Sequence, residues 1–331
     1  MGAYGMQVPI ARLALLLVMA AVPVSAQDMV FGFAGKSLDD VNFLTAFQGF
    51  EDEAKKNGDR AINIGEKGPE HFRKQSESLA TAITQNLDGI ALSVTNSDWL
   101  VGEIIPAVAA KNIPVITFDS DFEPKHSRFR KSFIGPDNVE IGRDMAKLAK
   151  QFLPKGGTLS LMTGGQHVAR QNPNLIDRMS GVRQELSGNS AHPKNQPLHG
   201  EGGWTETVDS PWYTNDEEKL AIKQVKMTVL NPKVDVMISV GHWPVVDEAA
   251  YRAMMTSALA NLKKKPIIIV AVGAISPEKK MLMDDKLIHG YVSLNFDQMG
   301  RLSYQNLRKL ANGEKIPARI SQENIVVRSS Q

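Results

Sequence analysis

Short apolar runs alternate with amphipathic helical stretches from residue 29 almost to the end of this 331-residue chain. The runs typical of buried strands are residues 29–33, 61–64, 89–93, 115–119, 158–162, 234–240, 266–272 and 288–294. Between them, apolar side chains recur at helical spacing, as Phe43, Phe47 and Phe50 do. Apolar strands separated by helices are typical of mostly parallel sheets covered on both faces. The sequence therefore predicts an α/β fold.

The strand and helix pattern falls into two blocks, one closing near Lys131 and one opening at residue 133. A chain of about 300 residues exceeds the size at which a single core stops growing, which favours two domains. The segment after residue 294 is too short for a third domain and must add elements to both blocks. We expect the polar stretch 187–207 to be a surface excursion.

The first 26 residues carry the pattern of a cleavable export signal. Arg12 gives the positive flank, residues 13–22 form a short apolar run, and residues 24–26 (Val-Ser-Ala) match a small-residue cleavage site. A membrane anchor is the alternative, but a span needs about 20 apolar residues and this run is shorter. We therefore expect a mature protein that begins near Gln27 and works in the periplasm.

Charge and cysteine content exclude several classes of partner and chemistry. The chain has 38 Lys and Arg against 36 Asp and Glu, so it has no large basic field for nucleic acid or an anionic membrane. It has no cysteine, which excludes disulfides, thiol nucleophiles, cysteine metal sites and a lipid anchor on cysteine. We expect a protein that is free in its compartment and has no nucleic-acid partner.

Several short segments follow one another in an order that one known family shares. They are 42–43 (Asn-Phe), 87–90 (Leu-Asp-Gly-Ile), 112–119 (Asn-Ile-Pro-Val-Ile-Thr-Phe-Asp), 135–138 (Gly-Pro-Asp-Asn), 178–182 (Arg-Met-Ser-Gly-Val), 290–292 (Gly-Tyr-Val), 297–300 (Asp-Gln-Met-Gly) and 312–314 (Asn-Gly-Glu). The chain resembles the periplasmic sugar-binding proteins of the ribose and galactose type, whose fold, periplasmic binding protein type I, is shared with lactose-repressor-like regulators. A regulator would need a DNA-binding helix pair where the export signal stands.

The resemblance covers nearly all of the mature chain and implies two doubly wound parallel-sheet lobes joined by three crossings. The crossings would lie near Gly135, near residues 293–295 and near Ser321. The N-terminal lobe would then comprise residues 27–134 plus 295–320, and the C-terminal lobe residues 135–294 plus 321–331. It also implies a monomer whose lobes close around a ligand held in the cleft between them.

Asp119 is the first candidate ligand contact, because it directly follows a buried strand. Ligands of open α/β sheets gather at the carboxyl ends of the strands, where a carboxylate can accept hydrogen bonds from two hydroxyl groups. The resemblance implies a ligand-binding Asp here, and a turn-capping carboxylate is the alternative. Ser120 stands where the family often has Arg. Ser93 ends another strand and matches a polar contact position, or bonds only to local backbone.

The first loop supplies Asp40, Asn42 and Phe43 as further candidates. The resemblance places stacking aromatics at residues 42 and 43, of which only Phe43 is aromatic. Phe43 could equally belong to the core stripe that it forms with Phe47 and Phe50. Asp40 either contacts the ligand or caps the helix that follows.

The C-terminal lobe supplies Arg178, Trp212, His242 and Trp243, and the second crossing supplies Asn295. The guanidinium fork of Arg178 suits a ring oxygen, adjacent hydroxyls or an anionic group, and an exposed helix Arg is the alternative. Trp212 lies near a stacking aromatic of the family, or is ordinary loop packing.

The second lobe is poorer in acceptors than the family pattern. His242 and Trp243 replace a common Asn-Asp pair, and Gly273-Ala274 stands where a ligand-binding Asp is common. Asn295 could replace some of the lost contacts. These replacements favour a less hydroxylated, modified or anionic ligand.

No nucleophile elbow, zinc helix or phosphate-binding loop occurs in the sequence, and its seven histidines show no metal-ligand spacing. We therefore expect no enzyme activity, no metal and no cofactor. The resemblance implies an extracytoplasmic solute-binding protein that closes on a small polar ligand, a sugar, polyol or sugar derivative, and delivers it to an ABC importer in the inner membrane. A sensory binding protein for a chemoreceptor or histidine kinase is one alternative. A periplasmic enzyme on the same fold, using Asp119 or His242, is the other.

Overall fold

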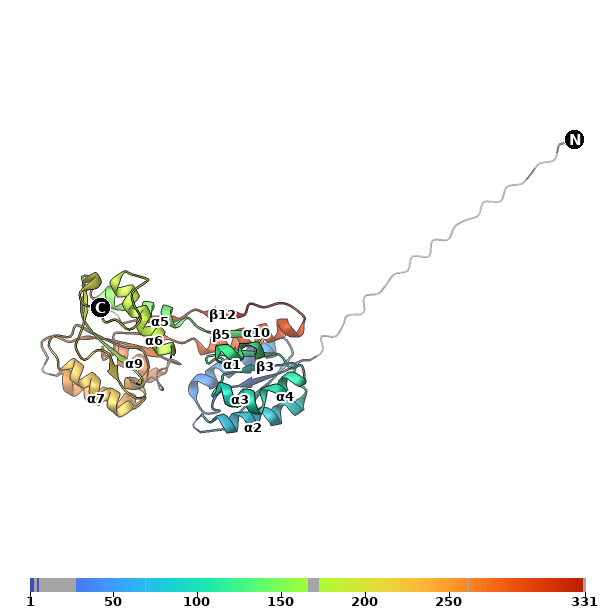
Figure 1. The fold of residues 1–331 in the computed structure, drawn as a ribbon, viewed down its shortest axis with the longest axis horizontal. Helices are drawn as coiled ribbons and strands as arrows, with labels where there is room; N and C mark the ends of the chain where they lie inside the picture. Colours follow the sequence, from blue (N-terminus) through green and yellow to red (C-terminus); the bar gives the residue numbers. More distant parts are fainter. Residues whose placement is uncertain (3–4, 6–27, 69, 166–172, 261, 330–331) are drawn as a thin grey trace.

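The computed structural model describes residues 1–2, 5, 28–68, 70–165, 173–260 and 262–329. Apart from residues 1, 2 and 5, the predicted export signal lies outside this range. Figure 1 shows two lobes, each built of a sheet with helices packed around it. No helix in the described parts of the chain is long and apolar enough to cross a membrane.

Lobe one is a six-stranded parallel sheet with the strand order β12-β5-β4-β3-β1-β2. Its strands are β1 (Val30–Ala34), β2 (Arg60–Ile64), β3 (Gly89–Leu92), β4 (Val115–Phe118), β5 (Ser132–Pro136) and β12 (Arg319–Gln322). Its helices are α1 (Val41–Lys56), α2 (Phe72–Ala82), α3 (Ser97–Glu103), α4 (Ile105–Ala110) and α10 (Phe296–Ala311), with the 3-10 turns η1 (Ile83–Gln85) and η2 (Pro124–Phe129). Separate apolar clusters cover its two faces.

Lobe two repeats this plan in the order β13-β11-β10-β9-β6-β7, with β8 also paired to β6. Its strands are β6 (Gly157–Thr163), β7 (Trp204–Glu206), β8 (Trp212–Tyr213), β9 (Val236–Ser239), β10 (Ile267–Val272), β11 (Gly290–Ser293) and β13 (Ile325–Arg328), of which β13 alone is antiparallel to its neighbour. Its helices are α5 (Asn138–Phe152), α6 (Pro173–Ser187), α7 (Glu218–Val229), α8 (Glu248–Leu259) and α9 (Pro277–Asp284), with the 3-10 turns η4 (Glu201–Gly203) and η5 (Trp243–Val245). The two doubly wound sheets confirm the predicted fold class.

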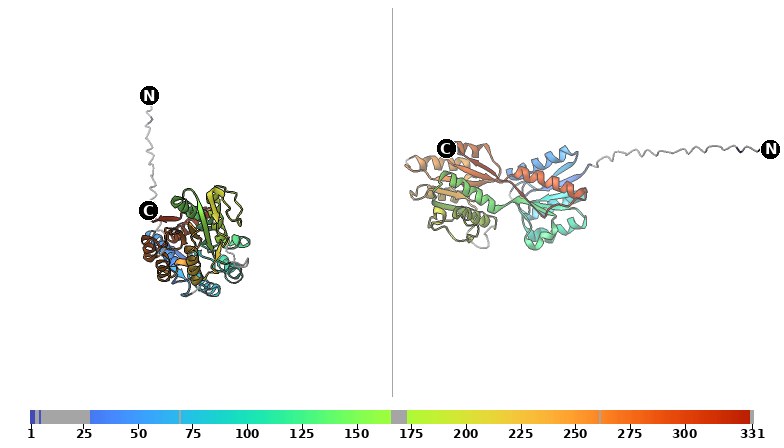
Figure 2. Two further views of the ribbon diagram at one scale, coloured as in Figure 1. Left: turned by 90° about the vertical axis from the view of Figure 1, so that its left-hand side faces the viewer. Right: turned by 90° about the horizontal axis from the view of Figure 1, so that it is seen from above.

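The chain passes between the lobes after β5, after β11 and after β12. Seen from above, the connecting segments run side by side through the middle of the molecule (Figure 2). Gly135 pairs with Ser321 inside the first sheet, so both residues lie in lobe one, two residues before the chain leaves it. We therefore place these two boundaries after Pro136 and Gln322, slightly later than the family resemblance implies.

Each lobe contains a close helix crossing made possible by glycines. A Cβ added to Gly300 of α10 would lie 1.8 Å from the carbonyl oxygen of Ala46 in α1, and Gly49 faces α10 in the same way. In lobe two, added Cβ atoms on Gly142 of α5 and Gly181 of α6 would lie 1.9 and 2.0 Å from the backbone of the partner helix. The contact between α1 and α10 attaches α10 to lobe one, where it lies beside α1 (Figure 1).

The stretch 187–207 is only in part the surface excursion that the sequence predicts, because it ends in β7 at the edge of the second sheet. Trp204 is fully buried there, and so is Glu206. Glu206 forms a two-fold ion pair with Arg183 of α6, with N–O distances of 2.7 and 3.0 Å. It also accepts a hydrogen bond of 2.7 Å from Ser210 Oγ. A buried charge pair therefore fastens this stretch to α6.

Replacement of Arg183 by Met should lower the free energy of unfolding by about 3–5 kcal/mol, because it leaves the Glu206 carboxylate buried without its cation. Urea unfolding followed by circular dichroism measures the change. Lys55→Met is the matched control, since it removes an exposed pair with Glu51 on α1 and should cost at most about 1 kcal/mol. Equal losses in the two variants would contradict the prediction.

Stability should also fall between pH 6.5 and pH 4 because of His289. Its Nδ1 accepts a hydrogen bond of 3.1 Å from the N–H of Ile268, and burial, with a smaller effect of Lys286, lowers the pKa of His289 to about 4. An unfolded histidine titrates near pH 6.5, so in this window the unfolded chain binds more protons and stability drops as the pH falls. Urea unfolding at several pH values should show a shallower drop for His289→Gln. An unchanged slope would count against this assignment.

Candidate ligand-binding site

The carboxyl ends of both sheets border one cleft of about 430 Å³ between the lobes. Asp119 follows β4 of lobe one, while Gly241 and Gly273 follow β9 and β10 of lobe two. Lobe one lines it with Lys36, Asp40, Asn42, Phe43, Glu70, Asp119, Ser120 and Phe296. Lobe two and the adjoining crossing line it with Asn174, Leu175, Arg178, Asp216, Gly241, His242, Trp243, Ala271, Val272, Gly273 and Leu294. In doubly wound folds this edge of the sheet is the usual place for a ligand.

Asp119 is held at the cleft surface by neighbours in lobe one. Its Oδ2 accepts hydrogen bonds from Ser93 Oγ (2.9 Å) and Ser120 Oγ (3.2 Å), and it lies 3.7 Å from Lys36 Nζ. Asp119 has φ 57°, in the left-handed region where a non-glycine residue is strained and which is often found at functional sites. These contacts with described residues all use Oδ2, so among them the other carboxylate oxygen remains available to a hydroxyl group.

Lys36 is a cleft residue two positions beyond β1. Burial by itself lowers the pKa of Lys36, but the nearby carboxylates of Asp119 and Glu70 outweigh it and raise the pKa above its usual value. The Nζ of Lys36 lies 3.6 Å from the Glu70 carboxylate. A charged ammonium therefore stands beside Asp119 at neutral pH.

Arg178 approaches the cleft from α6 in lobe two. Its Nε donates to Asn138 Oδ1 and its Nη1 to the carbonyl of Val240, both at 2.9 Å. Burial lowers the pKa of Arg178 to about 10, while Asp119 in the other lobe acts in the opposite direction. The guanidinium thus stays charged at neutral pH. Two neutral acceptors fix its plane, and within the described part of the chain this leaves Nη2 for a ligand oxygen.

His242 and Trp243 form the aromatic part of the lobe-two wall, with their rings 6.3 Å apart and nearly parallel. Trp243 is largely buried in the core of lobe two, whereas His242 is exposed in the cleft. Desolvation by the surrounding walls lowers the pKa of His242, and the charges of Lys279 and Arg178 add to this effect. A neutral imidazole, able both to donate and to accept, therefore faces the cleft at pH 7.

The three first-loop candidates all line the cleft, and each has a second contact. Phe43 packs edge-on against Phe118 and Phe296, so it belongs to the core and to the cleft floor at once. Asp40 caps α1 by accepting the N–H of Asn42 at 2.8 Å. Asn42 itself reaches across to lobe two.

Three predicted contacts lie outside the cleft lining. Ser93 is fully buried and touches Asp119 from behind. Trp212, in β8, packs against the core of lobe two. Asn295 caps α10 by accepting the N–H of Gln298, and its backbone pairs with the side-chain amide of Gln322 at 2.7 and 3.1 Å. Ser93 therefore supports Asp119, Trp212 belongs to the core of lobe two, and Asn295 stabilises the segments that connect the lobes.

The predicted contacts did not include five charged or polar lining residues, Lys36, Glu70, Ser120, Asn174 and Asp216. Lys36 could have been found, because it lies only two positions beyond β1, while Asp119 directly follows β4. Glu70 and Asp216 precede helices, Asn174 lies in the first turn of α6, and none of the three carries a comparable signal in the sequence.

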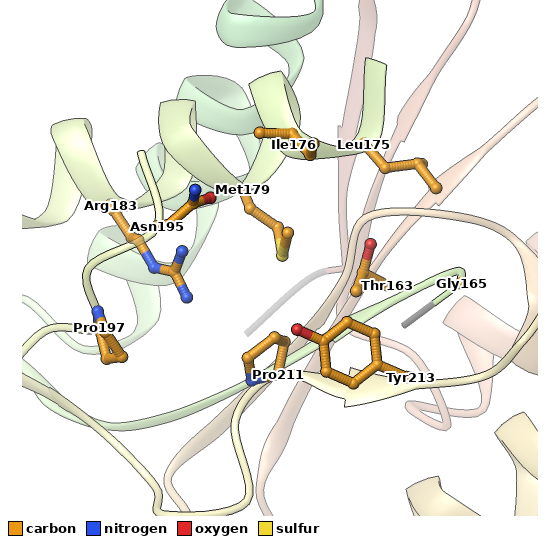
Figure 3. A pocket seen from close by; sticks show the side chains of 10 residues that line it. All are labelled: Thr163, Gly165, Leu175, Ile176, Met179, Arg183, Asn195, Pro197, Pro211 and Tyr213. Carbon is orange, nitrogen blue, oxygen red and sulfur yellow. The ribbon is translucent and has the colours of Figure 1, made fainter. Parts of the chain in front are cut away.

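A second cavity of about 230 Å³ lies within lobe two, on the other side of Leu175. Figure 3 shows Tyr213 and Pro211 opposite Met179 across this cavity, with Arg183 at one end. Among its described lining residues only Arg183 is charged, and that guanidinium is already paired with Glu206. The larger cleft, which charged side chains of both lobes line, is therefore the candidate ligand site. Over the described ranges, no group of three or more metal-binding side chains could hold an ion.

The model of the periplasmic binding protein domain matches residues 31–315, and the chain belongs to this family. A curated relative is the ribose import binding protein RbsB of Bacillus subtilis (strain 168), which is 24% identical over 138 residues. That match covers 42% of this chain and 43% of the relative, less than half of either.

Solved structures resemble the whole fold. An ABC transporter solute-binding protein from Burkholderia graminis, in complex with D-arabinose, has a TM-score of 0.69 and 21% identity, covering 92% of this chain and 96% of its own. One from Actinobacillus succinogenes with bound D-allose has a TM-score of 0.70 and 15% identity, covering 91% and 98%. A sugar-binding protein from Bacillus halodurans has a TM-score of 0.70 and 18% identity, covering 91% and 97%. At these identities the likeness establishes the type I fold.

Asp119→Asn should weaken ligand binding about ten- to a hundredfold, because a hydrogen bond to a charged acceptor is worth about 1.5–3 kcal/mol. Isothermal titration calorimetry with a ligand of the wild-type protein measures the loss. Asp121→Asn is the control, since this carboxylate lies in the same loop but pairs with Arg130. Wild-type affinity in Asp119→Asn would remove Asp119 from the site.

Proposed function

We propose that this protein is a periplasmic sugar-binding protein that closes its two lobes around a single small ligand and delivers it to an ABC importer. The observation that carries the proposal is the convergence of Asp119 from lobe one and Arg178 from lobe two on one cleft. Its volume falls within the range of about 300–1,000 Å³ usual for small-molecule sites. The sugars bound to the structural relatives support the same ligand class.

The cleft favours a neutral sugar or polyol over an anion. Its described lining carries four carboxylates, Asp40, Glu70, Asp119 and Asp216, against the two cations Lys36 and Arg178. This excess of negative charge repels an anionic ligand. It thus argues against the anionic class, which the sequence pattern of lobe two favoured together with less hydroxylated or modified ligands. Hydroxyl groups suit both kinds of side chain, because they donate to carboxylates and accept from cations.

The binding residues would divide their roles by chemistry. Asp119 and Asp40 accept from hydroxyl groups, Arg178 and His242 bond to ring or hydroxyl oxygens, and Phe43 offers an apolar surface to the C–H face of the sugar. Contacts from both lobes make the closed form bind more tightly than the open form, and this difference drives closure. A permease that recognises the closed form would then receive the ligand, and the bound molecule would leave unchanged.

A thermal-shift screen of aldopentoses, aldohexoses, polyols and sugar acids tests the proposal. A ligand at one hundred times its Kd stabilises the native state by about 2.7 kcal/mol, which raises the Tm by several degrees. We expect a shift with a neutral sugar or polyol, recovery of that compound intact, and no shift with its acid. Binding of acids alone would contradict the charge argument, and conversion of the ligand would indicate an enzyme.

A further inference from the structure

Asn42 joins the two lobes directly across the cleft. Its Oδ1 accepts a hydrogen bond of 2.7 Å from the N–H of Ala274, which lies 232 positions further along the chain. Asn42 belongs to the first turn of α1 in lobe one, whereas Ala274 follows β10 in lobe two. The bond therefore depends on the distance between the lobes.

The absence of a side chain at Gly273 makes room for this contact. A Cβ at that position would lie 2.1 Å from Oδ1 of Asn42, closer than real atoms approach. Asn42 thus fills the space beyond β10 that a larger residue at position 273 would occupy. The two lobes therefore contact each other directly at this point.

Both partners are held in place by their own lobe. Asp40 accepts the backbone N–H of Asn42 and fixes the start of α1. In lobe two, Ser293 Oγ donates to the carbonyl oxygen of Gly273 at 2.6 Å, which steadies the chain just before the Ala274 amide. Because both groups are already fixed, formation of the bond costs little conformational entropy. Most of the free energy of the hydrogen bond therefore stabilises the arrangement of the lobes that allows it.

We propose that Asn42 is a latch that stabilises the closed arrangement of the ligand-free protein by accepting the Ala274 amide. The bond joins groups of the two lobes, so it is lost when the lobes separate at this point. Apparent affinity scales with the fraction of protein that is already competent to bind, so the latch would tighten binding of every ligand that prefers the closed form. Asn42 then acts as a positioning residue.

Single-molecule FRET on the ligand-free protein tests the latch. The chain has no cysteine, so Lys67→Cys in lobe one and Glu218→Cys in lobe two, both at exposed positions, provide the only dye sites. Asn42→Ala should lower the ratio of closed to open molecules about two- to tenfold, the usual net worth of one neutral hydrogen bond. Asn42→Asp keeps the acceptor oxygen and should retain most of the closed population.

Gly273→Ala gives an independent test of the same contact. The added Cβ should lower the ratio of closed to open molecules in the otherwise unmodified protein. It should lower this ratio much less when Asn42 is already Ala, so the effects of the two substitutions should be strongly non-additive. Circular dichroism confirms that each variant is folded. An unchanged ratio in Asn42→Ala, or equal losses in the Ala and Asp variants, would overturn the proposal. Because no ligand is present, this outcome is independent of the ligand screen.

Discussion

The close crossing of α10 over α1 is the contact on which the two-lobed architecture depends. Glycines at the crossing let the backbones approach closely, so that α10 packs on lobe one although β11, directly before it, belongs to lobe two. The chain must then return once more to place β13 in the second sheet. The connecting segments follow from this exchange of elements, and the cleft lies where they hold the two sheet edges opposite each other.

Much of the fold can be predicted from the sequence, because buried parallel strands are apolar throughout and stand out between helices. Gly181 and Gly300 belong to segments that carry the family resemblance, and the structure shows a physical need for both at helix crossings.

The stretch 187–207 was harder to interpret. Its polar composition suggests a loop, but Glu206 is buried because Arg183 neutralises it from another element. A pairing of this kind leaves no local trace in the sequence.

The sequence predicts that the candidate site lies at the carboxyl edge of the sheets, but it does not predict which side chains line the cleft. The position of Asp119 after a buried strand was enough to find it, and the same argument applied to β1 would have found Lys36. That argument cannot tell which side chains point into the cleft. Ser93 also follows a strand, yet it lies behind the Asp119 carboxylate. Trp212 and Asn295 were also predicted to contact the ligand. Instead, Trp212 packs against the core of lobe two, and the side chain of Asn295 caps α10.

The discontinuous build of lobe one also bears on how the chain folds. Its outer strand β12 and its helix α10 come from the last part of the sequence, whereas α1 and β1 come from the first. Lobe one therefore cannot bury its face beneath α1 and α10 until nearly the whole chain has been synthesised. Contacts between such distant segments form late, since the loop between them must close first. Most of lobe two, by contrast, lies in one continuous stretch and can collapse on its own. A chain of this design leaves the ribosome with its N-terminal lobe still unfinished.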